Sequence, residues 1–254
     1  MDLGITGKRA IVAAGSAGLG LATAVSLARN GAQVVICGRD VARLDAAVAT
    51  INAASANGGS CRGIQHDVAT HETAMEFVRK AIELLGGVDI LVTNGGGPPP
   101  GKAIDTPIDK YPAALEQSLL SVIGMCQVAL PHMREQKWGR IVAITSISVK
   151  QPIATLALSN TARAGVTGYL KSLAIDIASE GITVNSVQPG IHLTDRIKDV
   201  SGNTLSAQAF GIPAGFIGDA GDFGEICAFF ASEQAKYITG AHLNVDGGQY
   251  AGLQ

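Results

Sequence analysis

The sequence predicts a single α/β domain in which a parallel sheet is covered by helices on both faces. Short runs rich in β-branched residues alternate with longer amphipathic stretches along the whole chain, which is the pattern of repeated β-α-β units. Apolar residues make up 47% of the 254 residues and charged residues only 16%, as strands buried on both faces require. One such sheet commonly uses a chain of this length, so residues 1–254 are expected to form one domain.

Seven strands are expected, with helices over most of the intervals between them. The expected strands are Arg9–Ala14, Gln33–Cys37, Cys61–His66, Asp89–Thr93, Arg140–Thr145, Thr183–Val187 and His242–Val245. Right-handed crossovers wind successive strands outward in two directions, so the seven-stranded sheet is doubly wound and a crevice opens at the carboxyl ends of its central strands. Ligands are expected in that crevice.

Two segments interrupt the alternation. Residues from about 191 to 218 are rich in Gly, Ser, Pro and Asp and are too long for an ordinary connector, which predicts a mobile substrate lid. The run Asn94–Gly101 follows a buried strand and therefore opens onto the same crevice; the alternative is a plain turn.

Composition argues against several partners and sites. A net charge of −2 gives no electrostatic reason to bind nucleic acid or an anionic membrane. The four cysteines are far apart without C-x-x-C spacing, which is typical of buried thiols in a reducing compartment, and no histidine has metal-ligand spacing. With neither a signal-peptide pattern at Met1 nor an apolar run of about 18 residues, a cytoplasmic protein without a metal is expected.

A glycine-rich loop follows the first expected strand and leads into an apolar-periodic helix. Glycine allows the backbone to approach a pyrophosphate closely, and the helix N-terminus supplies free N–H groups and a positive dipole end. The loop is therefore expected to bind the diphosphate of a dinucleotide; the alternative is a structural turn. Its candidate residues are Gly15, Ser16, Ala17, Gly18, Leu19 and Gly20.

The end of the second strand bears on the choice between NAD and NADP. A carboxylate would bind the two ribose hydroxyls of NAD, but Cys37 and Gly38 offer none. Arg39 can pair with a 2′-phosphate through its guanidinium, which favours NADP(H), although NAD stays possible. The alternative is that Arg39 is a solvated surface cation.

Together with Asp67-Val68, Thr93-Asn94-Gly95-Gly96, Pro189-Gly190 and the ending Val245-Asp246-Gly247-Gly248, these features resemble the short-chain dehydrogenase/reductase family over essentially the whole chain. The nearest likeness is to 3-oxoacyl-(acyl carrier protein) reductases. The resemblance implies a Rossmann-type fold, an NAD(P)(H)-dependent oxidoreductase acting on a ketone or alcohol, and a homotetramer. It also implies cofactor contacts: the adenine at Asp67 and Val68, the channel at Asn94, Gly95 and Gly96, and the nicotinamide carboxamide at Pro189, Gly190, His192 and Thr194.

The chain departs from the family pattern at the positions that carry the chemistry. The family serine corresponds to Ser146, but thirteen residues later, where the family has Tyr-x-x-x-Lys, the chain has Ser159 and Arg163. The family's tetrad asparagine aligns with Ser118, and the phosphate loop begins Ala13-Ala14 in place of Thr-Gly.

Carbonyl reduction needs a proton for the developing alkoxide, which a tyrosine of lowered pKa ordinarily supplies. A serine is far less acidic and shorter, and a guanidinium stays protonated. Arg163 can replace the lysine in holding the nicotinamide ribose, or Ser159 and Arg163 are only positioning residues. Substitute acids are His192, Lys150 and Ser146; for His192 the alternative is an outward-facing side chain.

Two functions follow. The first is an oxidoreductase with atypical catalytic residues Ser146, Ser159 and Arg163 acting on a small carbonyl or alcohol. The second is a protein that kept the fold and the NADP(H) site and serves as a sensor or scaffold without efficient catalysis.

Overall fold

The computed structural model describes residues 1–195, 197–198 and 205–253. Seven parallel strands form one sheet in the order β3-β2-β1-β4-β5-β6-β7. The predicted Rossmann-type doubly wound fold is confirmed, and every strand ends within two residues of its expected position. The strands are β1 (Arg9–Val12), β2 (Gln33–Gly38), β3 (Ser60–Gln65), β4 (Ile90–Thr93), β5 (Gly139–Ile144), β6 (Ile182–Pro189) and β7 (His242–Val245).

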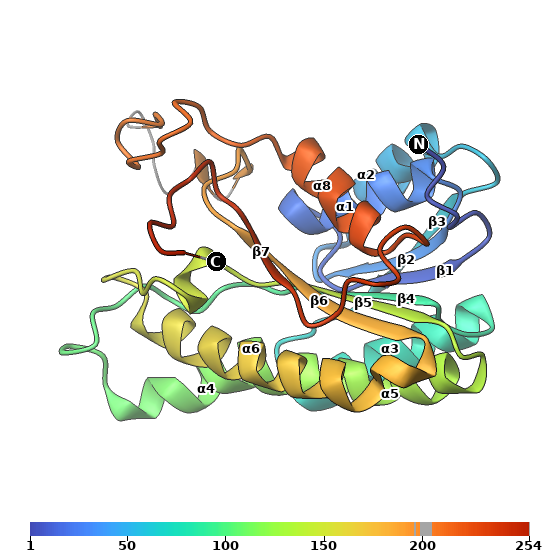
Figure 1. Ribbon diagram of the computed structural model, residues 1–254, viewed down its shortest axis with the longest axis horizontal. Helices are drawn as coiled ribbons and strands as arrows, with labels where there is room; N and C mark the ends of the chain where they lie inside the picture. Colours follow the sequence, from blue (N-terminus) through green and yellow to red (C-terminus); the bar gives the residue numbers. More distant parts are fainter. Residues whose placement is uncertain (196, 199–204, 254) are drawn as a thin grey trace.

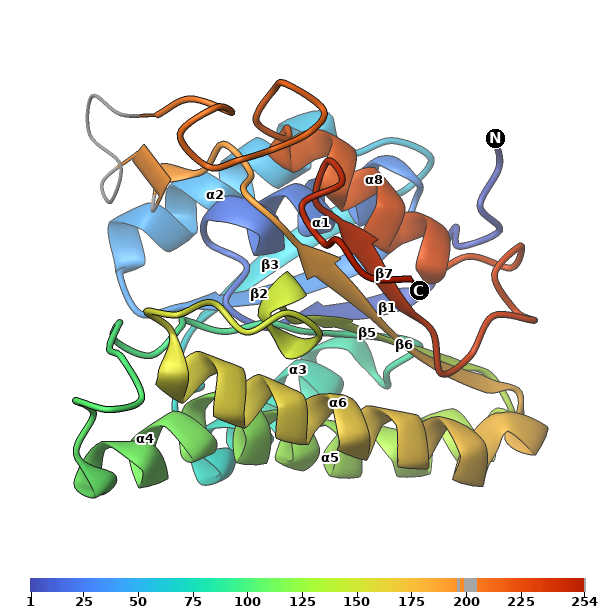
Figure 2. The ribbon, with the colours of Figure 1, turned by 60° about the vertical axis from the view of Figure 1, so that its left-hand side comes forward.

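Helices cover both faces of the sheet (Figure 1). On one face lie α1 (Gly18–Arg29), α2 (Val41–Ala54) and α8 (Ala220–Phe230), which share an apolar core with that side of the strands. On the other face α3 (His71–Leu85), α5 (Ser121–Glu135) and α6 (Ala157–Ile177) form a second core. Both views show this three-layer arrangement (Figure 2).

Local sequence signals explain where several helices begin and end. The Asp40 side chain accepts the Arg43 backbone N–H at the start of α2, and Thr70 forms a capping box with Thr73 at the start of α3. Gly86 ends α3 with φ of 75°, a left-handed conformation that glycine adopts without a steric cost. Strand β1 and the residue before β4 are joined by Arg9 and Asp89, whose Nε and Oδ2 atoms lie 2.8 Å apart.

Residues Ile108–Glu135 form one continuous 28-residue helical stretch that is long and apolar enough to cross a membrane. It comprises η1 (Ile108–Lys110), α4 (Tyr111–Leu115), a π-helical turn η2 (Glu116–Leu120) and α5. The sequence led us to expect no stretch of this kind. Because Met125, Ala129 and Met133 are fully buried in the core beneath the sheet, we assign this stretch as a core helix of the domain.

The predicted lid, from about residue 191 to 218, leaves and returns to the domain at one place. His192 and Gly218 form a backbone bridge, and the Leu193 N–H donates to the Gly218 carbonyl at 2.8 Å. Positions 196 and 199–204 of this segment lie outside the described residues. The described part begins directly after β6, so it borders the crevice.

Candidate active site

A cleft of about 790 Å³ lies at the carboxyl ends of β1, β2, β4, β5 and β6, where the ligand crevice was expected. Most of the residues predicted for the site line it. They are Ser16, Ala17, Gly18, Leu19, Arg39, Asp67, Val68, Asn94, Gly95, Gly96, Ser146, Ser159, Arg163, Pro189, Gly190, His192 and Thr194. The remaining two, Gly15 and Gly20, lie behind the wall and shape it.

The loop between β1 and α1 is packed so tightly that two of its glycines have no room for a side chain. A Cβ on Gly15 would lie 2.7 Å from Ile36 Cγ2, and one on Gly20 would lie 2.6 Å from both the Ala14 oxygen and Asn94 Nδ2. Asn94 Nδ2 donates to the Ala14 oxygen at 3.2 Å, which joins the β4 loop to the phosphate loop. Glycine at these two positions therefore allows the loop backbone to pack closely behind the cleft wall.

The N-terminus of α1 is open toward this loop. Ala17 occupies the N-cap position and provides no side-chain cap, so the first N–H groups of the helix stay available for an anion. Gly18 has φ of 55°, and a Cβ there would come within 3.5 Å of Thr194 Cγ2 from the lid segment. An anion could therefore be held where the diphosphate is expected.

The opposite end of the cleft carries two exposed guanidinium groups, Arg39 and Arg43. A Cβ on Gly38 would lie 2.5 Å from Ser16 Oγ, so a side chain at that position would require Ser16 to move. The Asp40 carboxylate is engaged at the helix N-cap. The sequence analysis missed Arg43, although its spacing of four residues from Arg39 at the start of α2 was an available signal.

Ser146, Ser159 and Arg163 all line the cleft near the carboxyl end of β5. Ser146 Oγ accepts the Ser148 backbone N–H at 3.1 Å and thereby caps the short helix η3 (Ile147–Val149). Arg163 Nε donates to Ser159 Oγ at 3.2 Å and its Nη1 donates to the Ile144 oxygen at 3.3 Å. These bonds direct the guanidinium along the carboxyl end of β5, on the same wall of the cleft as both serines.

Among the described residues, the cleft wall contains neither a tyrosine nor a lysine. Lys150 does not point into the cleft as expected: its Nζ donates to the His242 oxygen at 3.0 Å and lies 5.5 Å from the centre of the Tyr250 ring. Tyr169 is half-buried beside Cys126, and this desolvation raises the pKa of its phenol above the usual range. The expectation of Lys150 as an acid in the crevice is therefore wrong.

His192 lies against the interior of the domain. Only 5% of its surface is exposed, its ring meets Phe223 edge to face with centroids 5.0 Å apart, and it also lines the cleft. Burial lowers the pKa of the imidazole below its ordinary value, so the ring is neutral at pH 7. The alternative of an outward-facing histidine is wrong.

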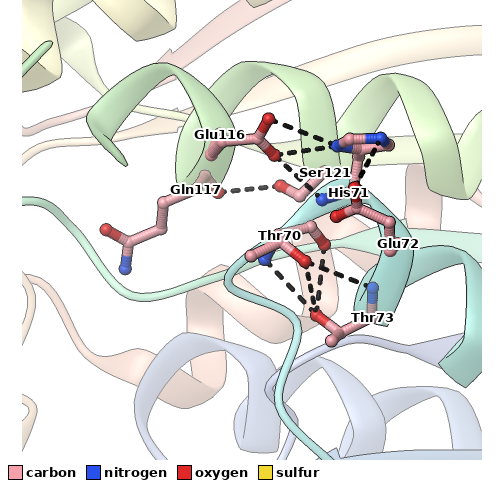
Figure 3. A network of polar contacts seen from close by, with 7 residues as sticks. All are labelled: Thr70, His71, Glu72, Thr73, Glu116, Gln117 and Ser121. Atoms are coloured by element: carbon pink, nitrogen blue, oxygen red, sulfur yellow. Dashed lines mark hydrogen bonds and ion pairs between the residues drawn. The ribbon is translucent and has the colours of Figure 1, made fainter. Parts of the chain in front are cut away.

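The π-helical turn η2 brings Gln117 to the cleft wall, a residue that the sequence analysis missed. Ser121 Oγ donates to the Gln117 backbone oxygen at 2.8 Å, and the neighbouring Glu116 carboxylate accepts the His71 backbone N–H at 3.1 Å (Figure 3). Ser118, the residue expected at the position of the family asparagine, is buried with an unpaired hydroxyl and does not line the cleft. No sequence pattern predicts the extra residue of a π-helical turn.

One cluster of potential metal ligands, His71, Glu72 and Glu116, lies outside the cleft. The two ring nitrogens of His71 face different carboxylates: Nδ1 lies 3.0 Å from Glu116 and Nε2 lies 3.1 Å from Glu72 (Figure 3). The hydrogen bond with Glu116 raises the pKa of the His71 imidazole. Slight desolvation opposes this effect, and the negative charges of Glu72 and Glu116 add to it. This geometry suits an imidazolium between two carboxylates better than a metal, which would need both groups on one side of the ring.

The residues present fit a pyridine dinucleotide. The glycine cradle and the open helix N-terminus suit its diphosphate, the two guanidinium groups suit the adenosine side, and the hydroxyls at the end of β5 lie at the other end of the cleft.

Comparison with known proteins agrees with this arrangement. A family model described as "Enoyl-(Acyl carrier protein) reductase" matches residues 13–249. The 3-oxoacyl-(acyl carrier protein) reductase FabG of Vibrio cholerae serotype O1 is 34% identical over 98% of this chain and 99% of its own length. The chain belongs to the short-chain dehydrogenase/reductase family.

A further relative and two solved structures are similar to the chain over nearly its whole length. L-rhamnose 1-dehydrogenase (NAD(P)(+)) of Sphingomonas sp. is 35% identical over 98% of this chain and 99% of its own length. The crystal structure of YwfH, an NADPH-dependent reductase, superposes with a TM-score of 0.91 at 27% identity, covering 98% of this chain and all of YwfH. L-sorbose reductase of Gluconobacter frateurii, complexed with NADPH and L-sorbose, superposes with a TM-score of 0.90 at 28% identity over the full length of both chains.

Proposed function

We propose that the protein is an NADP(H)-dependent oxidoreductase that reduces a ketone or oxidises an alcohol, with Ser159 and Arg163 in place of the family's tyrosine and lysine. The observation that carries the proposal is the continuity of the cleft from Arg39 and Arg43, past the phosphate loop, to Ser146 and Arg163. The relatives support the reaction type, because they include reductases and a dehydrogenase of carbonyl and hydroxyl groups.

The preference for NADP(H) rests on the adenosine end of the cleft. Guanidinium groups at Arg39 and Arg43 match a 2′-phosphate, whereas position 38 is a glycine and offers no carboxylate for the ribose hydroxyls. YwfH and L-sorbose reductase use or bind NADPH, in agreement with this assignment.

When bound, the cofactor supplies or accepts a hydride. The chain's own residues then hold the substrate: the Ser146 hydroxyl donates to the carbonyl oxygen, and Arg163, fixed by Ser159 and the Ile144 oxygen, positions the nicotinamide ribose. Gln117, Ile147 and Leu156 close the wall around the reacting groups and reduce their contact with water.

Equilibrium titration tests the cofactor site directly. We expect NADPH to bind at least about tenfold more tightly than NADH, since a charge-assisted pair to the 2′-phosphate contributes roughly 1.5–3 kcal/mol. The enhancement of nicotinamide fluorescence on binding measures both affinities. If neither nucleotide binds, the proposal is wrong.

A non-enzymatic sensor or scaffold is the second candidate, and the lack of tyrosine and lysine among the described cleft residues favours it. The double substitution Ser159→Tyr and Arg163→Lys separates the two functions. A large gain in carbonyl reduction shows that chemistry had been lost, whereas a fall in activity shows a working site that the substitution disrupts.

We also propose a homotetramer, as the family resemblance implies. Ile175 on α6 is 70% exposed, and β7 lies at an edge of the sheet, so both elements offer surface for contacts between copies. Light scattering combined with size-exclusion chromatography measures the mass; a monomer of 25.9 kDa would contradict the assignment.

A further inference from the structure

The side-chain amide of Gln117 is a polar group that the cleft leaves open to a ligand. Gln117 lies on the π-helical turn η2 and lines the cleft. Ser121 Oγ donates to its backbone oxygen, but within the part of the chain that the structure describes no protein group bonds to its side-chain amide. Figure 3 shows this side chain extending away from His71 and Glu116. The amide therefore keeps two N–H donors and an acceptor oxygen for a molecule in the cleft.

The loop after β4 packs against this amide. A Cβ on Gly96 would lie 2.9 Å from Gln117 Nε2, so a larger residue at position 96 would displace the amide. Farther along the same loop, Gly101 forms a backbone bridge with Leu156. Pro98 on this loop and Leu156 both line the cleft and are apolar. Gln117 is thus a neutral polar group beside an apolar surface, an arrangement that lets a pocket select one orientation of its ligand.

The backbone on both sides of the Gln117 amide is fixed by bonds to other elements. The carboxylate of the preceding residue, Glu116, accepts the His71 backbone N–H at 3.1 Å and lies 3.0 Å from His71 Nδ1 at the start of α3 (Figure 3). The bond from Ser121, 2.8 Å long, joins the Gln117 carbonyl to the start of α5. Among the described residues, Glu72 on α3 and Glu116 on η2 are the charged groups that face the His71 ring. Turns of the π type are frequent at functional sites, and this one is held to two helices.

We propose that Gln117 is a specificity-determining residue whose amide binds an uncharged hydroxyl group of the substrate beyond the reacting carbonyl, and that His71 and Glu116 are its positioning residues. A hydroxyl suits an amide because each can donate to the other. A charged group would lose its water without an opposite charge from the amide, which costs more than one hydrogen bond returns. The assignment rests on the NADPH-dependent reaction proposed above and adds its substrate class, a hydroxy ketone in the direction of reduction.

The first experiment compares ketones of equal size with the full-length protein and NADPH. α-Hydroxyacetophenone is paired with propiophenone, and β-hydroxypropiophenone with butyrophenone, so each pair exchanges a hydroxyl for a methyl group at one of two distances from the carbonyl. The loss of NADPH fluorescence gives kcat/KM for each ketone. We expect the hydroxy ketone of at least one pair to be preferred about tenfold or more, because a site that hydrogen-bonds a hydroxyl rejects the analogue without it.

Substitutions at position 117 test whether the amide causes this preference. Gln117→Leu removes the amide and keeps a side chain of similar size, so we expect the preference to fall about three- to tenfold, the effect of one hydrogen bond between neutral groups, mainly through KM. Gln117→Glu keeps an acceptor for the hydroxyl and should retain more of the preference than Gln117→Leu. Gln127→Leu, the same change at an exposed position of α5 outside the cleft, is the matched control and should leave the preference unchanged.

The pH dependence of the preference tests the positioning role. The hydrogen bond with Glu116 raises the pKa of His71 above its ordinary value, so the charged pair is intact below that pKa and weakens as the ring loses its proton above it. We expect the preference to fall as the pH rises from about 6.5 to 9, with the methyl analogue as the reference for every effect of pH on hydride transfer. Glu116→Gln should remove this pH dependence. A purely structural role of the pair would lower kcat/KM for both ketones together.

Each part of the assignment can fail separately. No preference within either pair, or an unchanged preference in Gln117→Leu, would overturn the assignment of Gln117 and leave the proposed oxidoreductase intact. A preference that does not vary with pH would overturn the positioning role of His71 and Glu116. Failure of NADPH to bind, or binding without reduction of any of the four ketones, would instead overturn the proposed function.

Discussion

Ala14 is the residue of the phosphate loop whose backbone conformation is most costly. Its φ is 47°, in the left-handed region that residues with a Cβ rarely adopt, and its N–H donates to Cys37 Sγ at 3.2 Å. This conformation costs an ordinary residue about 1–2 kcal/mol, whereas glycine adopts it freely. We therefore expect Ala14→Gly to stabilise the protein.

The magnitude follows from two opposing effects. Relief of the left-handed strain contributes about 1–2 kcal/mol, and the greater backbone entropy of glycine in the unfolded chain opposes it by roughly 0.5–1 kcal/mol. The net gain is about 0.5–1 kcal/mol, equivalent to roughly 1–4 °C in melting temperature for a domain of this size. NADPH affinity should change little, because the backbone path is unchanged.

Urea unfolding followed by circular dichroism, at one protein concentration, measures this gain. Ala13→Gly is the matched control: Ala13 is fully buried and has no positive φ, so this substitution should destabilise by about 1–2 kcal/mol through the lost methyl group and the added entropy. A midpoint for Ala14→Gly equal to or below that of the native protein would refute the reasoning.

Three further predictions concern charges and thiols. Arg39→Asp should weaken NADPH binding at least about tenfold and raise the affinity for NADH relative to the affinity for NADPH. Fluorescence titration can measure both affinities. Unchanged selectivity would show that Arg39 is a solvated cation. Although burial opposes it, hydrogen bonds from Arg9 lower the pKa of the Asp89 carboxyl, so this pair stabilises the fold above about pH 4 and the contribution is lost as pH falls further. Asp89→Asn should therefore cost about 2 kcal/mol at pH 7 in urea unfolding and should flatten the loss of stability at low pH; an unchanged acid profile would count against the pair. Burial raises the pKa of all four thiols, those of Cys37, Cys61, Cys126 and Cys227, to about 12. A thiol reagent at pH 8 should therefore label none of them in the native protein within minutes and all of them in urea. Rapid labelling of the native protein would contradict their burial.

The strands and the phosphate loop were predictable because their signals are local. Buried parallel strands must be short apolar runs, and a loop that approaches both a neighbouring strand and a diphosphate must use glycine where a Cβ would collide. A Cβ on Gly15 would collide with Ile36, and a Cβ on Gly20 would collide with the Ala14 backbone oxygen. The conformation of Ala14 itself carries no such signal, since alanine is common in every kind of element.

The wall around the reacting groups was less predictable because it depends on contacts between distant segments. Gln117 lines the cleft from the π-helical turn η2, and Ile153 and Leu156 line it from the loop after η3, where Ile153 is hydrogen-bonded to Asn160 of α6. His192 turned inward because Phe223 on α8 provides an aromatic surface for its ring. Each of these placements requires two elements that lie far apart in the sequence.

Lys150 shows how the direction of one side chain decides which chemistry is available. Its position after β5 suggested a substitute acid, but its amine bonds to the His242 backbone oxygen on β7 and lies beside Tyr250. What stays at the end of β5 is a pair of hydroxyls that accept N–H groups and a guanidinium that cannot lose its proton. Because these groups donate hydrogen bonds to a substrate oxygen but include no tyrosine, the double substitution Ser159→Tyr and Arg163→Lys tests directly how much of carbonyl reduction depends on a positioned acid.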